Sequence, residues 1–189
     1  MATLAEMAAV LGVFGTVAAT TMPQVLAGLD ESRVAGAARY MSSRLAEARM
    51  DAVAHSREVA IKFRQANGVY SFTVYVDGNR NGVLTRDIQR GIDTPTLGPE
   101  QLSDNFRNVD FGVQPGTPPI EPGDDPPGDD PIRLGNAKSA SFSTLGTATS
   151  GTIYVTGRGG AQYAVRIFGA TGKIRVYRFN RLTGKWLPA

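Results

Sequence analysis

The first thirty residues constrain this chain more than any other stretch. Between Leu4 and Leu29 the sequence carries a single charge, that of Glu6. At ~1.5 Å of rise per residue, a helix of about 26 residues is long enough to cross a hydrocarbon core of ~30 Å. We therefore expect residues 1–29 to form a transmembrane helix segment and residues 30–189 to form the soluble part.

Glu6 has two interpretations. A carboxylate at the front of an apolar helix is costly in a membrane, so it calls for a cationic partner. The spacing Thr3-x-x-Glu6 before an apolar run is also that of a capping box, in which the Glu side chain satisfies N-terminal amides. The two hold together, because a capped Glu near a chain terminus can still meet the α-ammonium of another subunit.

The pattern Thr3-Leu4-x-Glu6-Met7, followed by an apolar helix and then Pro23, resembles the N-terminus of type IV pilins and type II secretion pseudopilins. The resemblance implies that Glu6 pairs with the N-terminal amine of a neighbouring subunit during filament assembly. It also implies a single-pass protein of the bacterial inner membrane, with its head in the periplasm or on an extracellular filament.

The family's leader is not visible in this sequence. Family members begin with a short basic leader ending in Gly, followed by a Phe that becomes the methylated N-terminus, whereas Met1 and Ala2 stand at those positions here. Either a leader lies upstream, as a substrate for prepilin peptidase, or Met1 is removed before Ala2. A signal peptide is the alternative, but the lack of a basic n-region and the acidic Glu6 argue against it. The expected subunit-assembly residues are Ala2, Thr3 and Glu6.

Composition limits the chemistry of the remaining part. The roughly 160 residues after the membrane segment suit one domain with its own core. The chain has no cysteine and one histidine, His55, so disulfides, thiolate metal sites and histidine clusters are excluded. A serine–histidine–aspartate triad would depend on His55 alone, and no group of nucleophile, base and orienting residue stands out. We expect no enzyme.

An apolar stripe predicts that the helix continues to about Arg57. Its members recur at spacings of three and four: Val34, Ala38, Met41, Leu45, Ala48 and Ala52. Pro23 removes a backbone donor within the helix, so we expect a kink or a locally melted segment there. The narrow, alanine-rich stripe suits close packing on a sheet.

Strand patterns follow the helix. Val59, Ile61 and Phe63 alternate with polar residues, and Asn67-Gly68 predicts a type I′ turn into a second strand at 70–76. Further short strands are expected in a small antiparallel sheet at 138–143, 152–155, 162–168 and 173–179. Turns are expected at 157–160 and 170–172, where Gly157-Arg158-Gly159-Gly160 lacks the surroundings of a phosphate loop.

Two of these stretches resemble one branch of the pilin-like proteins. The run 45–61, with its Ala48-Arg49 pair, resembles the helix-to-strand junction of the GspH/FimT pseudopilins, and 142–146, 151–155 and 170–175 resemble their final meander. The resemblance implies an α+β, pilin-like fold in which a long N-terminal helix packs on a C-terminal antiparallel β-sheet head. Within that head, the helix should occupy 30–57 and the β-rich part 58–189.

Charge is divided along the chain. All seventeen acidic residues lie at or before Asp130, and the last third is strongly basic. Residues 114–136 are too rich in proline and acid to join a sheet, so we expect a long surface loop. The basic part suggests an anionic partner, which is either external or this acidic loop itself.

A short segment after the second strand resembles half of a calcium loop. Asp77, Asn79 and Asn81 precede Gly82 at the spacing of an EF-hand, but position twelve is Ile88 rather than a bidentate carboxylate. A plain Gly- and Asn-rich hairpin loop explains the same residues without metal. We expect no cofactor, with calcium as the weaker alternative.

Two functions remain. The leading hypothesis is a minor pseudopilin or pilin that joins a type II secretion or type IV pilus filament with other pilins, with a structural role in protein export. The alternative, implied by the FimT-like side of the family, is a minor pilin that binds DNA for uptake. Gly172-Lys173-Ile174-Arg175 resembles the Gly-Arg-x-Arg turn of that branch, and the candidate DNA-binding residues are Lys173, Arg175 and Arg178. Alternation places Lys173 and Arg175 on one face and Arg178 on the other.

Overall fold

The computed structural model describes the backbone of residues 3–189 and, within it, the side chains of Thr3, Met7 and residues 27–189. Among the helices that these described residues form, none is long and apolar enough to cross a membrane. Most side chains of the expected membrane segment 1–29 lie outside the described residues, so that assignment stays a prediction.

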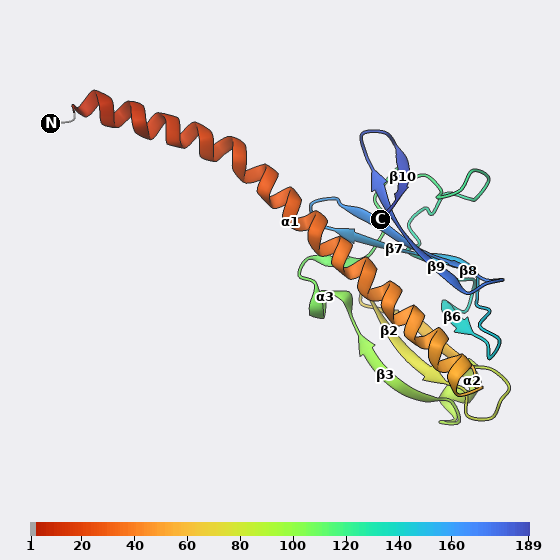
Figure 1. Cartoon of the computed structure of the whole chain (residues 1–189). Coiled ribbons are helices and arrows are strands. Elements are labelled where there is room, and N and C mark those ends of the chain that lie inside the picture. The colour runs from red at the N-terminus through yellow and green to blue at the C-terminus, as the bar shows by residue number, and fades with distance from the viewer. Residues whose placement is uncertain (1–2) are drawn as a thin grey trace.

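One long helix dominates the molecule. α1 runs from Leu4 to Ala54, and its first half projects away from the rest of the chain (Figure 1). Of the two alternatives expected at Pro23, a kink or a locally melted segment, the melted segment is wrong, because the backbone is helical through Pro23; the projecting half of the helix curves (Figure 1). α1 ends three residues before the predicted boundary at Arg57, because Ser56 has a left-handed φ of 48° that a helix cannot continue through.

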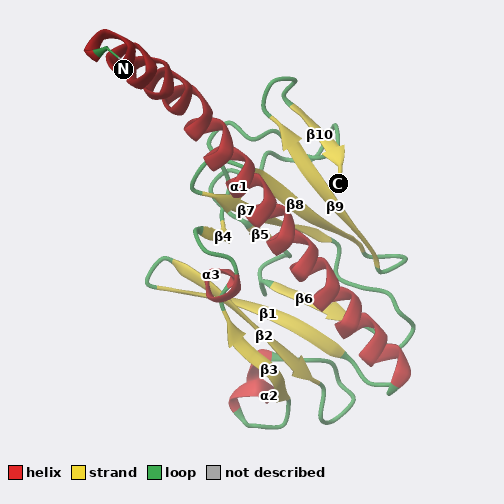
Figure 2. Cartoon of the chain, turned by 60° about the vertical axis from the view of Figure 1, so that its left-hand side comes forward, coloured by secondary structure: helices red, strands yellow, loops and turns green. Residues whose placement is uncertain are grey.

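The second half of α1 packs on the head through the predicted stripe. All six of its members are buried, as the spacing indicated: Val34, Ala38, Met41, Leu45, Ala48 and Ala52. They face strands of two different sheets, which α1 crosses in turn (Figure 2). The sequence predicted one small sheet. The structure has two: the strand predicted at 138–143 pairs with the hairpin that follows the helix, whereas the strands predicted at 152–155, 162–168 and 173–179 lie in a second sheet.

The first sheet carries the predicted hairpin. β1 (Val59–Ala66) pairs with β2 (Val69–Val76) through Asn67 and Gly68, whose φ values of 52° and 82° confirm the type I′ turn. β3 (Thr94–Glu100) and β6 (Ser139–Phe142) complete the order β3-β2-β1-β6. A connection over residues 77–93, which includes α2 (Thr85–Gln89), joins β2 to β3.

The second sheet has the order β10-β9-β8-β7-β4, and β5 also pairs with β7. Its strands are β4 (Val109–Phe111), β5 (Ile132–Arg133), β7 (Gly151–Gly157), β8 (Gln162–Phe168), β9 (Lys173–Asn180) and β10 (Lys185–Pro188). The short α3 (Leu102–Asn105) precedes β4. The expectation that 114–136 joins no sheet is wrong at one point, because β5 lies within it. Phe111 of β4 packs edge-on against Phe63 of β1 at 5.4 Å between ring centroids, which links the two sheets.

The head has two ends, and β9 runs between them. At the exit end, where α1 leaves the head, Arg178 of β9 lies 3.8 Å from Glu31. At the distal end, near the C-terminus of α1, Gly172 precedes β9 and contacts Arg49. Eighteen residues of helix separate Glu31 from Arg49, which corresponds to about 27 Å. The two ends can therefore meet different partners.

Candidate assembly and binding surfaces

The exit end is built around a buried carboxylate. Asp30 is 8% exposed, and its Oδ2 accepts a hydrogen bond of 3.2 Å from the amide of Ala161. The turn that contains Gly157 and Gly159 closes over it, and a Cβ added at Gly157 would lie 2.4 Å from Asp30 Oδ1. The predicted turn is thus confirmed, and its glycines leave room for the carboxylate of α1.

Glu31 makes a second tie between α1 and the sheet. The Tyr163 hydroxyl donates a 2.6 Å hydrogen bond to Glu31 Oε1, and Arg178 Nη1 lies 3.8 Å from the same oxygen. Burial, with this carboxylate as a further cause, raises the pKa of Tyr163. A pocket of about 290 Å³ opens beside these groups and is lined by residues that include Ala27, Gly160 and Arg181. Among the three candidate DNA-binding residues, Arg178 is the one that pairs with a carboxylate of α1, that of Glu31.

The distal end is held by two turns that touch. Arg49 Nε donates a 3.0 Å hydrogen bond to the carbonyl of Gly146, which has a φ of +79°. A Cβ added at Gly172 would lie 2.2 Å from that same carbonyl oxygen and 2.6 Å from Arg49 Nε. The Ala48-Arg49 pair and the turns at 142–146 and 170–175 are therefore neighbours in space, although they are far apart in sequence.

Lys173 and Arg175 are exposed on the outer face of the second sheet, away from α1. The Arg175 guanidinium lies 5.8 Å from the ring centroid of Phe168, and Arg166 lies 5.7 Å from the same ring. Within the described part of the chain, neither Lys173 nor Arg175 forms an ion pair. The structure therefore brings two of the three candidates together and places Arg178 on the opposite face, as strand alternation predicted.

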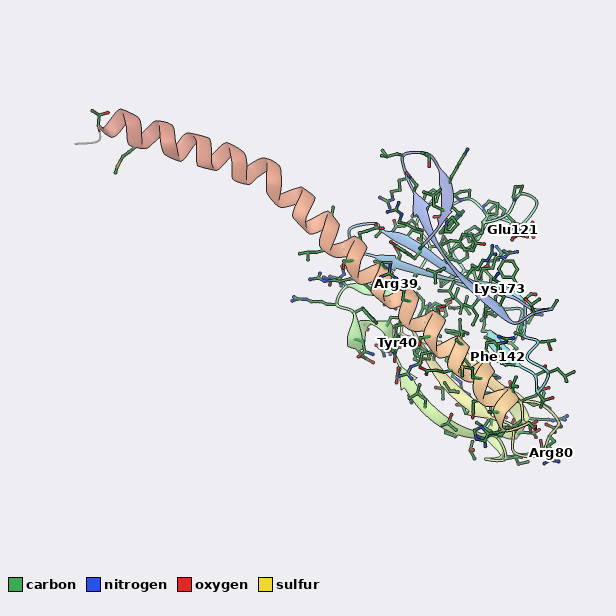
Figure 3. The ribbon with its side chains drawn as sticks, viewed as in Figure 1. Arg39, Tyr40, Arg80, Glu121, Phe142 and Lys173 are labelled. Carbon is green, nitrogen blue, oxygen red and sulfur yellow. The ribbon has the colours of Figure 1, made fainter. Side chains whose placement is uncertain are left out.

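The acidic loop binds other cations of the basic part. Arg166 lies 2.6 Å from Asp124 and 3.3 Å from Glu121, and Lys138 pairs with Asp130. Figure 3 labels Glu121 on this loop and Lys173 on the sheet. The loop is also fixed by Trp186, whose Nε1 donates a 3.0 Å hydrogen bond to the carbonyl of Pro118. The acidic loop is thus an anionic partner within the same chain. It neutralises Arg166 and Lys138, and not the candidate DNA-binding residues.

The candidate calcium residues organise backbone amides. Asp77 is 6% exposed; its Oδ1 accepts from the amides of Asn79 and Arg80 at 2.9 and 2.8 Å, and its Oδ2 accepts from Gly82 at 2.8 Å. The Asn81 side chain donates a 2.9 Å hydrogen bond to Asp87, the largest cause that lowers the pKa of Asp87. Among the described residues, no group of three or more histidines and carboxylates is placed to hold a metal ion. The segment is a long connection with its own helix, where the sequence predicted a plain hairpin loop.

The expected assembly residues lie mostly outside the described part. Ala2 and the side chain of Glu6 are not among the described residues, so their pairing and capping roles stay predictions. Thr3 is exposed, and its carbonyl accepts a 3.1 Å hydrogen bond from the amide of Met7 in the first turn of α1. His55 is exposed and lies 2.6 Å from Asp51, four residues earlier on the same helix.

Sequence reasoning missed the polar ties between α1 and the sheets. The hydroxyl of Tyr40, which is labelled on α1 in Figure 3, donates a 2.6 Å hydrogen bond to Glu100 on the edge strand β3 and accepts one of 3.1 Å from Arg44 Nε. Burial, with Glu100 as the next cause, raises the pKa of Tyr40. Asp30 reaches across 131 positions to Ala161. No local sequence pattern reports pairs at such separations. One signal was present: the turn at 157–160 has three glycines, more than a turn requires, and two of them, Gly157 and Gly159, lie against Asp30.

Comparison with known protein families finds a family model that matches this chain. The model of the type II transport protein GspH matches residues 37–171, which is more than half of the chain. No curated protein and no solved structure shows a match. The matched region begins within α1, contains both sheets' central strands and ends at the turn before β9. The chain belongs to the GspH family of type II transport proteins.

Proposed function

We propose that this chain is a minor pseudopilin, a subunit that joins the pseudopilus of a type II secretion system. Residues 1–29 hold it in the inner membrane, and the head at 30–189 extends into the periplasm. The observation that carries the proposal is the family match over residues 37–171. The partners are other pseudopilins and membrane lipid, with prepilin peptidase in addition if a leader precedes Met1.

The way in which α1 is attached supports a structural role. The projecting half of the helix continues without interruption into the half that crosses both sheets. Asp30, Glu31 and Tyr40 bind it to three different strands or turns. A head fixed to its helix in this way follows the helix when a filament grows, and this role needs no catalytic group or cofactor.

Assembly through the N-terminus is tested by the substitution Glu6→Gln. If the carboxylate neutralises the amine of a neighbouring subunit, the variant should remain in the membrane fraction with a folded head, but its incorporation into filaments should fall. The matched control is Glu47→Gln, which removes an exposed carboxylate from the same helix. Normal incorporation of Glu6→Gln would leave the capping role alone.

A second candidate function is DNA binding by a minor pilin of a DNA-uptake pilus. It is favoured by Lys173 and Arg175, two exposed cations beside the Phe168 ring that have no ion-pair partner among the described residues. Phosphate contacts from such residues give sequence-independent binding that weakens as salt rises. Lys173 lacks the planar fork of arginine, so its contact with phosphate would be that of a point charge.

Titration of a head lacking residues 1–28 with duplex DNA at low and moderate salt tests this second function. Lys173→Gln with Arg175→Gln should abolish binding. The matched control is Arg158→Gln with Arg181→Gln, which removes the same charge from exposed residues at the exit end. Absence of binding by the wild-type head at low salt, or equal binding by the first variant, rejects this surface as a DNA site.

A further inference from the structure

Exposed arginines surround the point where α1 leaves the head. Arg33 follows Asp30 by one helical turn, Arg158 lies in the turn between β7 and β8, and Arg181 lies in the turn after β9. Arg107, between α3 and β4, joins them because the amide of Arg158 donates a 3.2 Å hydrogen bond to the carbonyl of Asn108. We call these four residues the arginine collar. Arg181 and Gly160 line the same pocket as Ala27 and Asp30, which places the collar beside the helix.

The carboxylates nearby do not neutralise the collar. Asp30 is buried and accepts the amide of Ala161, and Glu31 is engaged by Tyr163 and Arg178. Asp110 accepts the amide of Phe111, and burial raises its pKa. Within the described part of the chain, none of the four collar arginines forms an ion pair. The four arginines therefore present positive charge to solvent at the exit end, whereas Asp30 is buried and Glu31 is engaged by groups of the head.

Two exposed leucines accompany these charges. Leu29 is 46% exposed on α1, one residue before Asp30, and Leu182 is 98% exposed in the turn that contains Arg181. An exposed apolar side chain beside arginines suits the boundary of a bilayer, where the apolar group meets the acyl region and the guanidinium meets phosphate. The apolar residues that precede Leu29 in the sequence lead into the same boundary.

We propose that the arginine collar binds the phosphate groups of anionic phospholipids in the membrane that anchors the chain. The proposal rests on the proposed membrane insertion of residues 1–29. Arginine suits this contact because its guanidinium presents two parallel donors to a phosphate. Each cation close to an anionic leaflet shifts a surface equilibrium by roughly fivefold. The collar thus holds the exit end of the head against the bilayer, with Leu182 at headgroup level.

The absence of native cysteine makes a single-label test possible. The full chain carrying Leu182→Cys, labelled with an environment-sensitive fluorophore, is reconstituted into vesicles of phosphatidylcholine alone or with added phosphatidylglycerol. We expect quenching by aqueous acrylamide to be markedly lower in the anionic vesicles. The matched label is Leu145→Cys, which is 89% exposed at the distal end and should be quenched equally in both.

Charge variants identify the residues responsible. Arg158→Gln with Arg181→Gln should restore quenching at position 182 in anionic vesicles, since two losses of roughly fivefold each remove most of the bound population. Lys173→Gln with Arg175→Gln removes the same charge at the distal end and should leave the protection intact. Equal loss in both variants would mean a general effect of net charge and would overturn the proposal.

Flotation of the same samples separates this proposal from the membrane anchor. The labelled chain should float with both kinds of vesicle, because insertion of the apolar segment does not need anionic lipid. Flotation with both but equal quenching at position 182 overturns the collar alone. Failure to float with either rejects the anchor and the collar together. Protection that appears in neutral vesicles and rises with protein density is contact between copies, which also overturns the lipid proposal.

Discussion

The two ends of the head are closed by glycine turns in different ways. At the exit end the Gly157–Gly160 turn closes on the side chain of Asp30, which belongs to α1. At the distal end the Gly172 turn closes on a backbone carbonyl, that of Gly146, and Arg49 of α1 donates to the same oxygen. At the exit end, helix and sheet are therefore connected through a side chain, the Asp30 carboxylate, which a substitution can remove. The distal end is a contact between two pieces of backbone that no side-chain change can relieve.

The largest effect is expected from Gly172→Ala. The new Cβ would meet the Gly146 carbonyl at 2.2 Å, and the residue has a φ of +60°. We expect a loss of about 3 kcal/mol or more in the free energy of unfolding, measured by denaturant titration. Gly184→Ala is the matched control, because its φ is +63° and nothing lies within 4 Å of its added Cβ. It should cost about 1 kcal/mol.

The comparison sharpens when Arg49→Ala is added to Gly172→Ala. Because the severe contact is with backbone, removing the arginine should not restore stability. Recovery to the level of the Gly184→Ala control would show that the side chain, and not the carbonyl, defines the distal end.

A smaller, reversible effect is expected from Gly157→Ala at the exit end. Its Cβ would meet Asp30 Oδ1 at 2.4 Å, while its φ is not in the left-handed region. The expected loss is about 2 kcal/mol, typical of overpacking. Asp30→Ala combined with Gly157→Ala should be more stable than the sum of the single effects predicts, since the clashing group is gone. Strict additivity would contradict a direct clash between the added Cβ and Asp30. Gly28→Ala is the control without a clash: its added Cβ meets nothing within 4 Å, and alanine should stabilise the helix slightly, by up to about 1 kcal/mol.

The smallest effect is expected from calcium at the distal end. The oxygens of Asp77 already accept three backbone amides, and the Asn81 amide is bound to Asp87. We therefore expect the melting temperature of a head lacking residues 1–28 to be the same in millimolar calcium and in chelator. A higher melting temperature in calcium, lost in Asp77→Asn, would mean that the loop binds the ion through its native state.

The parts of the fold that sequence could predict are those with local period or local turn chemistry. The stripe from Val34 to Ala52 and the Asn67-Gly68 turn each reported a structure made by neighbours in sequence, and both are confirmed. β3 was missed because its Thr, Pro and Gly residues show no alternation of apolar side chains, and β5 because two residues are too short for any pattern. The division into two sheets was missed for a different reason: no local pattern shows that β6 pairs with β1 and not with β7.

For the candidate surfaces, the sequence predicted which residues share a strand face, but not which charged residues pair with one another. Strand alternation correctly separated Arg178 from Lys173 and Arg175, because the period of a strand is local. What could not be foreseen is that Glu31 would engage Arg178 and that the acidic loop would engage Arg166. Those pairings join segments more than 40 residues apart in the sequence. The charge composition shows that cations and anions are both present, but it does not show which of them pair.

The central claim, that this chain is a subunit of a secretion pseudopilus, is tested most directly in cells that lack it. Release of secreted proteins and uptake of DNA are measured side by side after complementation with the wild-type chain, with Glu6→Gln, or with Lys173→Gln and Arg175→Gln. We predict that secretion fails in the deletion strain, returns with the wild type and with the distal double variant, and stays impaired with Glu6→Gln. Normal secretion in the deletion strain, together with a loss of DNA uptake that the distal variant does not restore, would contradict the account.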